Sequence, residues 1–113
     1  MIEYEELPEE ERRERLHEYV VDMFSYMSPE EVDGHCLNYP STVTTMIEIT
    51  HVHRLGCMAE GWDNGAHFEY IRFPESIAPL IRKHDVFLVT MGLDGDDWEV
   101  IYMSPPYEPV FVS

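Results

Sequence analysis

The chain has 113 residues, of which 44% are hydrophobic and 12% aromatic, so it is long and apolar enough to fold as a single domain over residues 1–113. Its 23 acidic and 7 basic residues give a formal net charge of −16, which opposes direct binding to nucleic-acid phosphates and to anionic membranes. The two cysteines are too few for a secreted disulfide scaffold. We expect neither a signal peptide nor a membrane span, and therefore a cytoplasmic protein.

The first predicted element is an amphipathic helix over residues 8–27. Leu16, Val20 and Met23 recur at spacings of four and three residues, which is typical of a helix with one face in the core. Pro8 suits the first position of a helix, and the acidic residues after it place negative charge at the positive end of the helix dipole. These features predict a well-defined start for this helix.

A second, shorter helix is predicted over residues 29–37. Ser28 is the expected N-cap, Pro29 suits the first helical position and Glu31 can complete a capping box. From Tyr39 onward the composition changes to β-branched residues, and apolar and polar side chains alternate with a period of two. The chain is therefore expected to change from helix to sheet at this point.

The rest of the chain is predicted to form strands that are joined by tight turns and one short helix. In the first strand, residues 42–54, alternate positions as far as Ile49 are expected to face the core. The expected segments after it are a hairpin at 57–73 with a turn at Asp63-Asn64-Gly65, a short helix over 74–83, a hairpin of strands 85–92 and 97–103, and a short edge strand at 109–112. This order predicts an α+β fold, in which the N-terminal helix and the short second helix pack on one face of an antiparallel sheet of about four to five strands, with a short helix between strands.

His51, His53 and Cys57 form a candidate metal site. Histidines two residues apart on a strand point to the same side of the sheet, and imidazole and thiolate are both zinc ligands. Possible completing ligands are His35, Cys36 and His67. The spacing matches no established zinc motif, and ordinary strand residues explain it as well. A zinc-binding regulatory or catalytic protein is therefore the first alternative.

The sequence contains no established catalytic motif. It has no glycine-rich phosphate loop, no GxSxG and no dinucleotide-binding fingerprint. A reactive cysteine needs a nearby cation, and the acidic surroundings of Cys36 and Cys57 argue against a nucleophile. Asp94, Asp96 and Asp97 could hold Ca²⁺ or Mg²⁺, but a solvated hairpin turn explains them equally well. We therefore expect a protein that is not an enzyme and holds no cofactor.

The acidic charge is concentrated in the first third of the chain. Residues 1–33 carry 12 acidic residues and 3 arginines, a net −9, whereas residues 34–113 carry 11 acidic residues and 4 cations, a net −7. On the first predicted helix, Glu10, Glu14 and Glu18 form a row of like charges that costs roughly 0.2–0.5 kcal/mol per pair. The predicted partner-binding residues are Glu3, Glu6, Glu10, Glu14, Glu18, Glu30, Glu31 and Asp33.

Together these observations favour an acidic binding protein. Carboxylates at high density can occupy a basic groove and displace nucleic acid from it, so we expect an inhibitor that mimics nucleic acid and blocks a basic nucleic-acid-binding surface of a partner protein or complex. Small inhibitors of the anti-restriction and anti-CRISPR type act in this general way, and the analogy rests on charge and size alone. The second alternative is an acidic housekeeping domain adapted to high salt.

Overall fold

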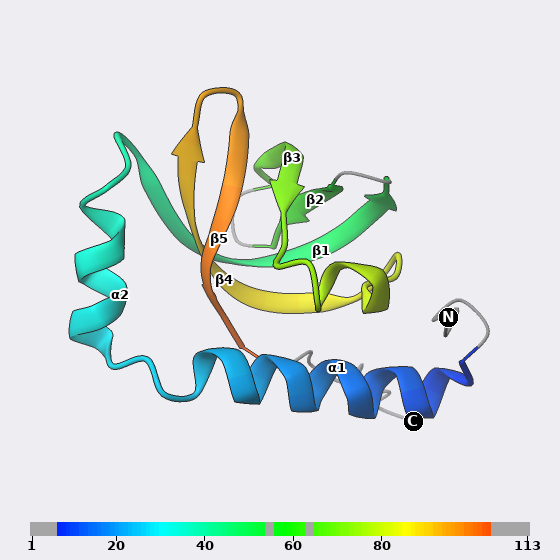
Figure 1. Ribbon diagram of the computed structural model, residues 1–113. Coiled ribbons are helices and arrows are strands. Elements are labelled where there is room, and N and C mark those ends of the chain that lie inside the picture. Colours follow the sequence, from blue (N-terminus) through cyan, green and yellow to red (C-terminus); the bar gives the residue numbers. More distant parts are fainter. Residues whose placement is uncertain (1–6, 54–55, 63–64, 105–113) are drawn as a thin grey trace.

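Five strands close into a barrel (Figure 1). The computed structural model describes residues 7–53, 56–62 and 65–104. The strands are β1 (Thr42–Val52), β2 (Cys57–Gly61), β3 (His67–Arg72), β4 (Val86–Asp94) and β5 (Asp97–Met103), and they neighbour one another in the order β1-β2-β3-β5-β4. Neighbouring strands are antiparallel except for β3 and β5, which are parallel. The α+β class is confirmed, but the sheet is mixed and closed, whereas the sequence predicted an antiparallel one.

The length of β1 explains how the barrel closes. Residues 42–48 pair with β4 and residues 47–52 pair with β2, so one strand of 11 residues joins both edges of the sheet. The register shifts between Ile49 and His51, and such a bulge bends a strand. Sequence alternation indicates which face of a strand is buried but not which strands pair across the barrel. The resulting strand order, with the third and fifth strands parallel, is the connectivity of an OB-fold barrel.

The alternation predicted for the first strand is confirmed. Thr45, Ile47 and Ile49 are buried in the barrel, and the positions between them are only partly buried. The two predicted hairpins are also present as β2–β3 and β4–β5, and Gly65 and Gly95 have positive φ angles of 65° and 66° at their turns. Asp63, Asn64 and the strand predicted at 109–112 lie outside the described residues.

Two helices precede the barrel. The first, α1 (Glu9–Phe24), begins after Pro8 and ends three residues earlier than predicted, and α2 (Pro29–Cys36) agrees with its prediction to within one residue. Ser28 caps α2 as expected, because its side chain accepts a hydrogen bond from the Glu31 backbone N–H at 3.2 Å. The short helix predicted over 74–83 is a single 3-10 turn, η2 (Ala78–Leu80), which contains a proline and therefore lacks one backbone donor.

The helix α1 lies across one end of the barrel, next to η2 (Figure 1). Its buried residues are Arg12, Leu16, Val20 and Phe24, one at every fourth position. The three apolar members join the same hydrophobic core as the strands and the residues around η2. Burial of this face therefore determines which side of the helix is turned to solvent.

The buried arginine of α1 is paired with an aspartate that directly precedes β4. The Arg12 guanidinium donates two hydrogen bonds to the Asp85 carboxylate, at 2.9 and 3.0 Å, and one to the Leu80 carbonyl at 2.6 Å. Asp85 also accepts a hydrogen bond from the Arg82 backbone N–H at 2.8 Å. Arg12 and Asp85 are only 2% and 6% exposed, so the pair is shielded from water and joins α1 to the barrel.

Glu9 completes this ion-pair network at the start of α1. Burial alone would lower the pKa of Arg12, but its hydrogen bonds with Glu9 and Asp85 outweigh this effect and raise the pKa. The same hydrogen bond to Arg12 lowers the pKa of Glu9 below its usual value of 4.5. Glu9 therefore stabilises the fold above pH 4.5, and this contribution is lost as the pH falls through the lower pKa of the folded state.

Replacing the buried arginine tests this attachment of α1. Arg12→Met leaves Asp85 buried without its cationic partner, and we expect a loss of about 3–5 kcal/mol in the free energy of unfolding. Arg13→Met removes a more exposed ion pair with Glu9 and should cost only about 0.3–0.5 kcal/mol. Urea unfolding followed by circular dichroism measures both values, and equal losses in the two variants would contradict the assignment.

Candidate functional site

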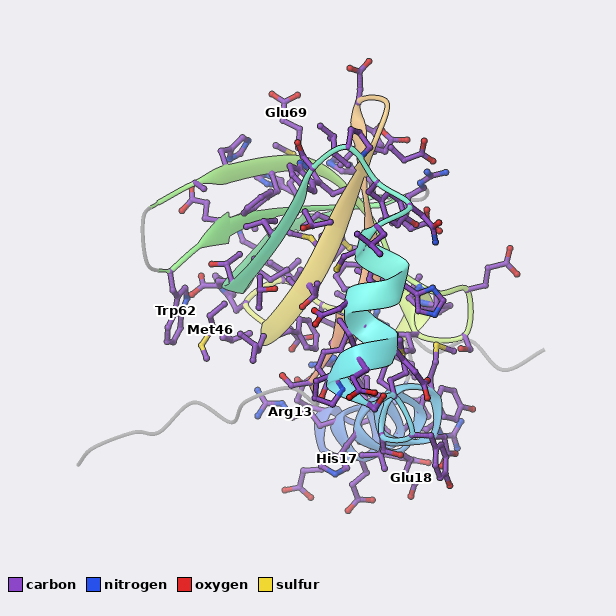
Figure 2. The ribbon with its side chains drawn as sticks, turned by 90° about the vertical axis from the view of Figure 1, so that its left-hand side faces the viewer. Arg13, His17, Glu18, Met46, Trp62 and Glu69 are labelled. Carbon is purple, nitrogen blue, oxygen red and sulfur yellow. The ribbon has the colours of Figure 1, made fainter. Side chains whose placement is uncertain are left out.

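The outer side of α1 carries a row of carboxylates opposite its buried side. The row consists of Glu10, Glu14, Glu18 and Asp22, all exposed. Each member precedes a buried residue by two positions, which places the two side chains about 200° apart around the helix. The acidic residues and the buried residues both recur every four positions, so the two sets stay on opposite sides along the whole helix. Figure 2 shows Glu18 on the side of α1 that is turned away from the barrel.

No cation within the described chain neutralises this acidic row. The two partly exposed arginines of α1 are engaged by other carboxylates: Arg13 pairs with Glu9 at 3.1 Å and Arg15 pairs with Glu11 at 3.4 Å. The four carboxylates of the row make no side-chain hydrogen bond or ion pair with another described residue. Their negative charge is therefore available to a partner.

Only some of the predicted partner-binding residues lie together in the structure. Glu10, Glu14 and Glu18 lie together in the acidic row, whereas Glu3 and Glu6 lie outside the described residues. The row also includes Asp22, which the sequence analysis did not assign. Its spacing of four residues from Glu18 was the signal that could have identified it.

The remaining predicted residues, Glu30, Glu31 and Asp33, are exposed on α2. This helix follows the C-terminal end of α1 and stands beside the barrel (Figure 1). None of its residues is buried, so α2 contributes little to the core. A helix with this little burial depends on its flanking segments for its position.

A tyrosine after α2 holds the connection to β1 against the barrel. The ring of Tyr39 lies so close to Gly92 of β4 that a Cβ at that position would be 2.3 Å from the ring. Its hydroxyl donates a hydrogen bond to the Glu99 carboxylate at 2.9 Å. Burial and this hydrogen bond raise the pKa of Tyr39 above its usual value of 10, so the hydroxyl remains a donor at neutral pH.

Large apolar side chains are exposed on both sides of α2. Tyr26, before the helix, is 83% exposed, and Leu37, after it, is 88% exposed. Aromatic side chains surrounded by polar residues are common anchors in protein interfaces. The surface around α2 thus combines acidic charge with apolar contact area, which suits a protein partner.

The candidate zinc ligands do not converge on one point. His51 and His53 are exposed, and their rings stack at a centroid distance of 6.2 Å, with Tyr70 stacked on His53 at 6.4 Å. Cys57 is 3% exposed and belongs to the hydrophobic core. The described residues contain no group of three or more His, Cys, Asp or Glu side chains that could hold a metal ion. The possible completing ligands His35, Cys36 and His67, all within the described residues, join no such group either.

Two of the three candidate cation ligands at the β4–β5 turn, Asp94 and Asp97, are paired with an arginine. Arg72 forms ion pairs with Asp94 at 3.1 Å and with Asp97 at 3.8 Å. An arginine between these carboxylates supplies the positive charge that a bound cation would otherwise provide. The arrangement agrees with a solvated hairpin turn.

The two thiols should differ in reactivity. Burial, together with the nearby Asp85 carboxylate, raises the pKa of Cys57 to about 11, whereas Cys36 is partly exposed at the end of α2. Treatment with Ellman's reagent at pH 8 should modify Cys36 quickly and Cys57 only after unfolding in urea. Fast modification of Cys57 in a Cys36→Ser variant would show that the core at β2 is more open than described.

A search for relatives gives no further constraint on the site. No protein-family model, no curated protein and no solved structure matches the chain. The function must therefore be inferred from the geometry and charge of the described residues.

Proposed function

We propose that the protein is a non-enzymatic inhibitor that binds a basic protein surface and excludes nucleic acid from it. The observation that carries the proposal is the acidic row of α1, Glu10, Glu14, Glu18 and Asp22. Its carboxylates face solvent, lack a cation among the described residues, and are carried by a helix whose opposite side is buried. Such a surface is preorganised for a cationic partner.

The spacing of the row supports competition with nucleic acid. Carboxylates at every fourth residue are separated by about 6 Å along the helix axis, and the row extends over about 18 Å. One strand of duplex DNA carries a phosphate charge every ~3.4 Å along its axis. A single row therefore carries less negative charge per length than a DNA strand. The carboxylates of α2 would add to the negative surface that a partner contacts.

Direct binding of nucleic acid by the barrel is opposed by its charge. Barrels of this connectivity can bind oligonucleotides, and the stacked His51, His53 and Tyr70 offer flat rings on the barrel surface. However, the described residues from 42 to 104 include nine acidic residues and only three Lys or Arg. The leading electrostatic interaction with phosphates is therefore repulsive.

The proposal places the protein in the cytoplasm together with a nucleic-acid-binding target. No helix in the described part of the chain is long and apolar enough to cross a membrane. Anti-restriction and anti-CRISPR inhibitors provide the closest functional analogy, on the basis of charge and size. The exposed Tyr26 and Leu37 favour a protein partner over a free polycation, because they offer apolar contact area.

Capture from the native host tests the proposal with two variants of equal charge. The first is the triple variant Glu10→Gln, Glu14→Gln and Glu18→Gln, which changes the net charge from −16 to −13. The matched control replaces three exposed acidic residues of the barrel, Glu60→Gln, Glu69→Gln and Asp96→Asn, with the same change in total charge. The two proteins differ only in where the charge was removed.

We expect the wild-type protein and the barrel control to retain a basic nucleic-acid-binding protein at low salt, identified by mass spectrometry. The α1 variant should bind it about tenfold more weakly, because three ion pairs of about 0.5 kcal/mol each are lost. Equal retention by both variants, or the absence of a basic nucleic-acid-binding protein, would contradict the proposal. Melting of the wild-type protein below about molar salt would instead indicate adaptation to high salt.

A further inference from the structure

A groove lies beside the acidic row, between the C-terminal half of α1 and the segment that leads into η2. Its volume is about 430 Å³. It is lined by Tyr19, Asp22, Met23, Glu75, Ser76 and Pro79. One of these residues, Asp22, is also the last member of the acidic row, so the groove continues the surface already assigned to the partner.

The lining of the groove combines apolar walls with two carboxylates. Met23, which is 42% exposed, and Pro79 present apolar surface from opposite sides. Asp22 comes from α1 and Glu75 from the chain before η2, and both are exposed. Neither carboxylate forms an ion pair with a described residue, and no lysine or arginine of the described ranges lines the groove. The groove therefore offers negative charge together with apolar contact.

The walls of the groove are held in place by the core. Val20 and Phe24 anchor this half of α1, and Ile77 and Leu80 anchor the opposite wall, with each of these side chains at most 5% exposed. A ligand would meet two sides that are already positioned, so binding would require little ordering of the protein.

We propose that this groove receives an arginine or lysine side chain of the basic partner. Such side chains lay their aliphatic stems on apolar surface while the charged head stays near water and carboxylates. Met23 and Pro79 would contact the stem, and Asp22 and Glu75 would attract the head. This assignment rests on the proposed function and specifies the chemical group that the acidic surface recognises.

Other occupants fit the groove less well than a cationic side chain. A second copy of the chain carries a net charge of −16 and would be repelled, as would nucleic acid. A neutral apolar side chain would remove water from Asp22 and Glu75 without replacing the lost interactions, which is unfavourable. A cationic side chain satisfies both parts of the lining.

A pair of small probes tests the groove without the partner. N-acetyl-arginine methylamide carries the cationic side chain, and N-acetyl-citrulline methylamide has nearly the same shape without the charge. Binding of each probe to the wild-type protein is followed by NMR from the methyl signal of Met23. We expect saturable shifts with the arginine probe at millimolar concentration and at least tenfold weaker binding of the citrulline probe.

Variants with matched charge locate the interaction. Asp22→Asn and Glu75→Gln should each weaken binding of the arginine probe at least threefold, whereas Glu69→Gln, on the barrel surface and outside both the acidic row and the groove, should leave it unchanged. All three side chains are exposed, and unchanged spectra of the barrel core will confirm that each variant folds. Equal shifts with both probes, no response of Met23, or equal weakening by Glu69→Gln would overturn the assignment.

The result of the groove test can be distinguished from the result of the test of the proposed function. If partner capture depends on the α1 carboxylates but Met23 does not respond to the arginine probe, the groove assignment is wrong and the proposed function stands. If the arginine probe binds in the groove but no basic nucleic-acid-binding protein is captured, the proposed function is wrong and the groove remains a site for cationic side chains.

Discussion

The arrangement of this protein depends on a buried ion pair between residues that are 73 positions apart in sequence, Arg12 of α1 and Asp85 before β4. Charged groups lose favourable hydration on burial, so each needs the other in good hydrogen-bonding geometry. Rotating or sliding α1 by one residue would separate them and leave two unpaired charges. The pair thus restricts how α1 lies on the barrel more sharply than its apolar neighbours do, because apolar contacts tolerate small shifts.

The orientation of α1 has a direct consequence for the outer surface. With Arg12 turned toward the barrel, the residues two positions before each buried one face solvent, and these are the four acidic residues of the row. Like charges at this spacing oppose helix formation slightly. The buried side of α1 compensates for this cost through its contacts with the core, so the helix can present an uncompensated acidic surface and remain folded.

The sequence predicted those features that depend on neighbouring residues. The Ser28 cap, the alternation up to Ile49 and the β4–β5 hairpin are encoded within a few positions and were confirmed. Closure of the barrel, the parallel β3–β5 pair and the burial of Arg12 depend on contacts between distant segments, which local patterns do not contain. The charge pattern located the acidic row on α1, but the groove next to it required a second wall from the chain around η2, about 55 residues away.

The central claim is that the acidic surface competes with nucleic acid for a basic protein. Fluorescence anisotropy of labelled duplex DNA bound to the captured partner measures this competition directly. The account predicts that adding the protein returns the anisotropy to that of free DNA, at concentrations that rise with ionic strength, because both ligands need the same cationic surface. A partner that binds the protein and the duplex at the same time, with no change in DNA occupancy, would contradict the account.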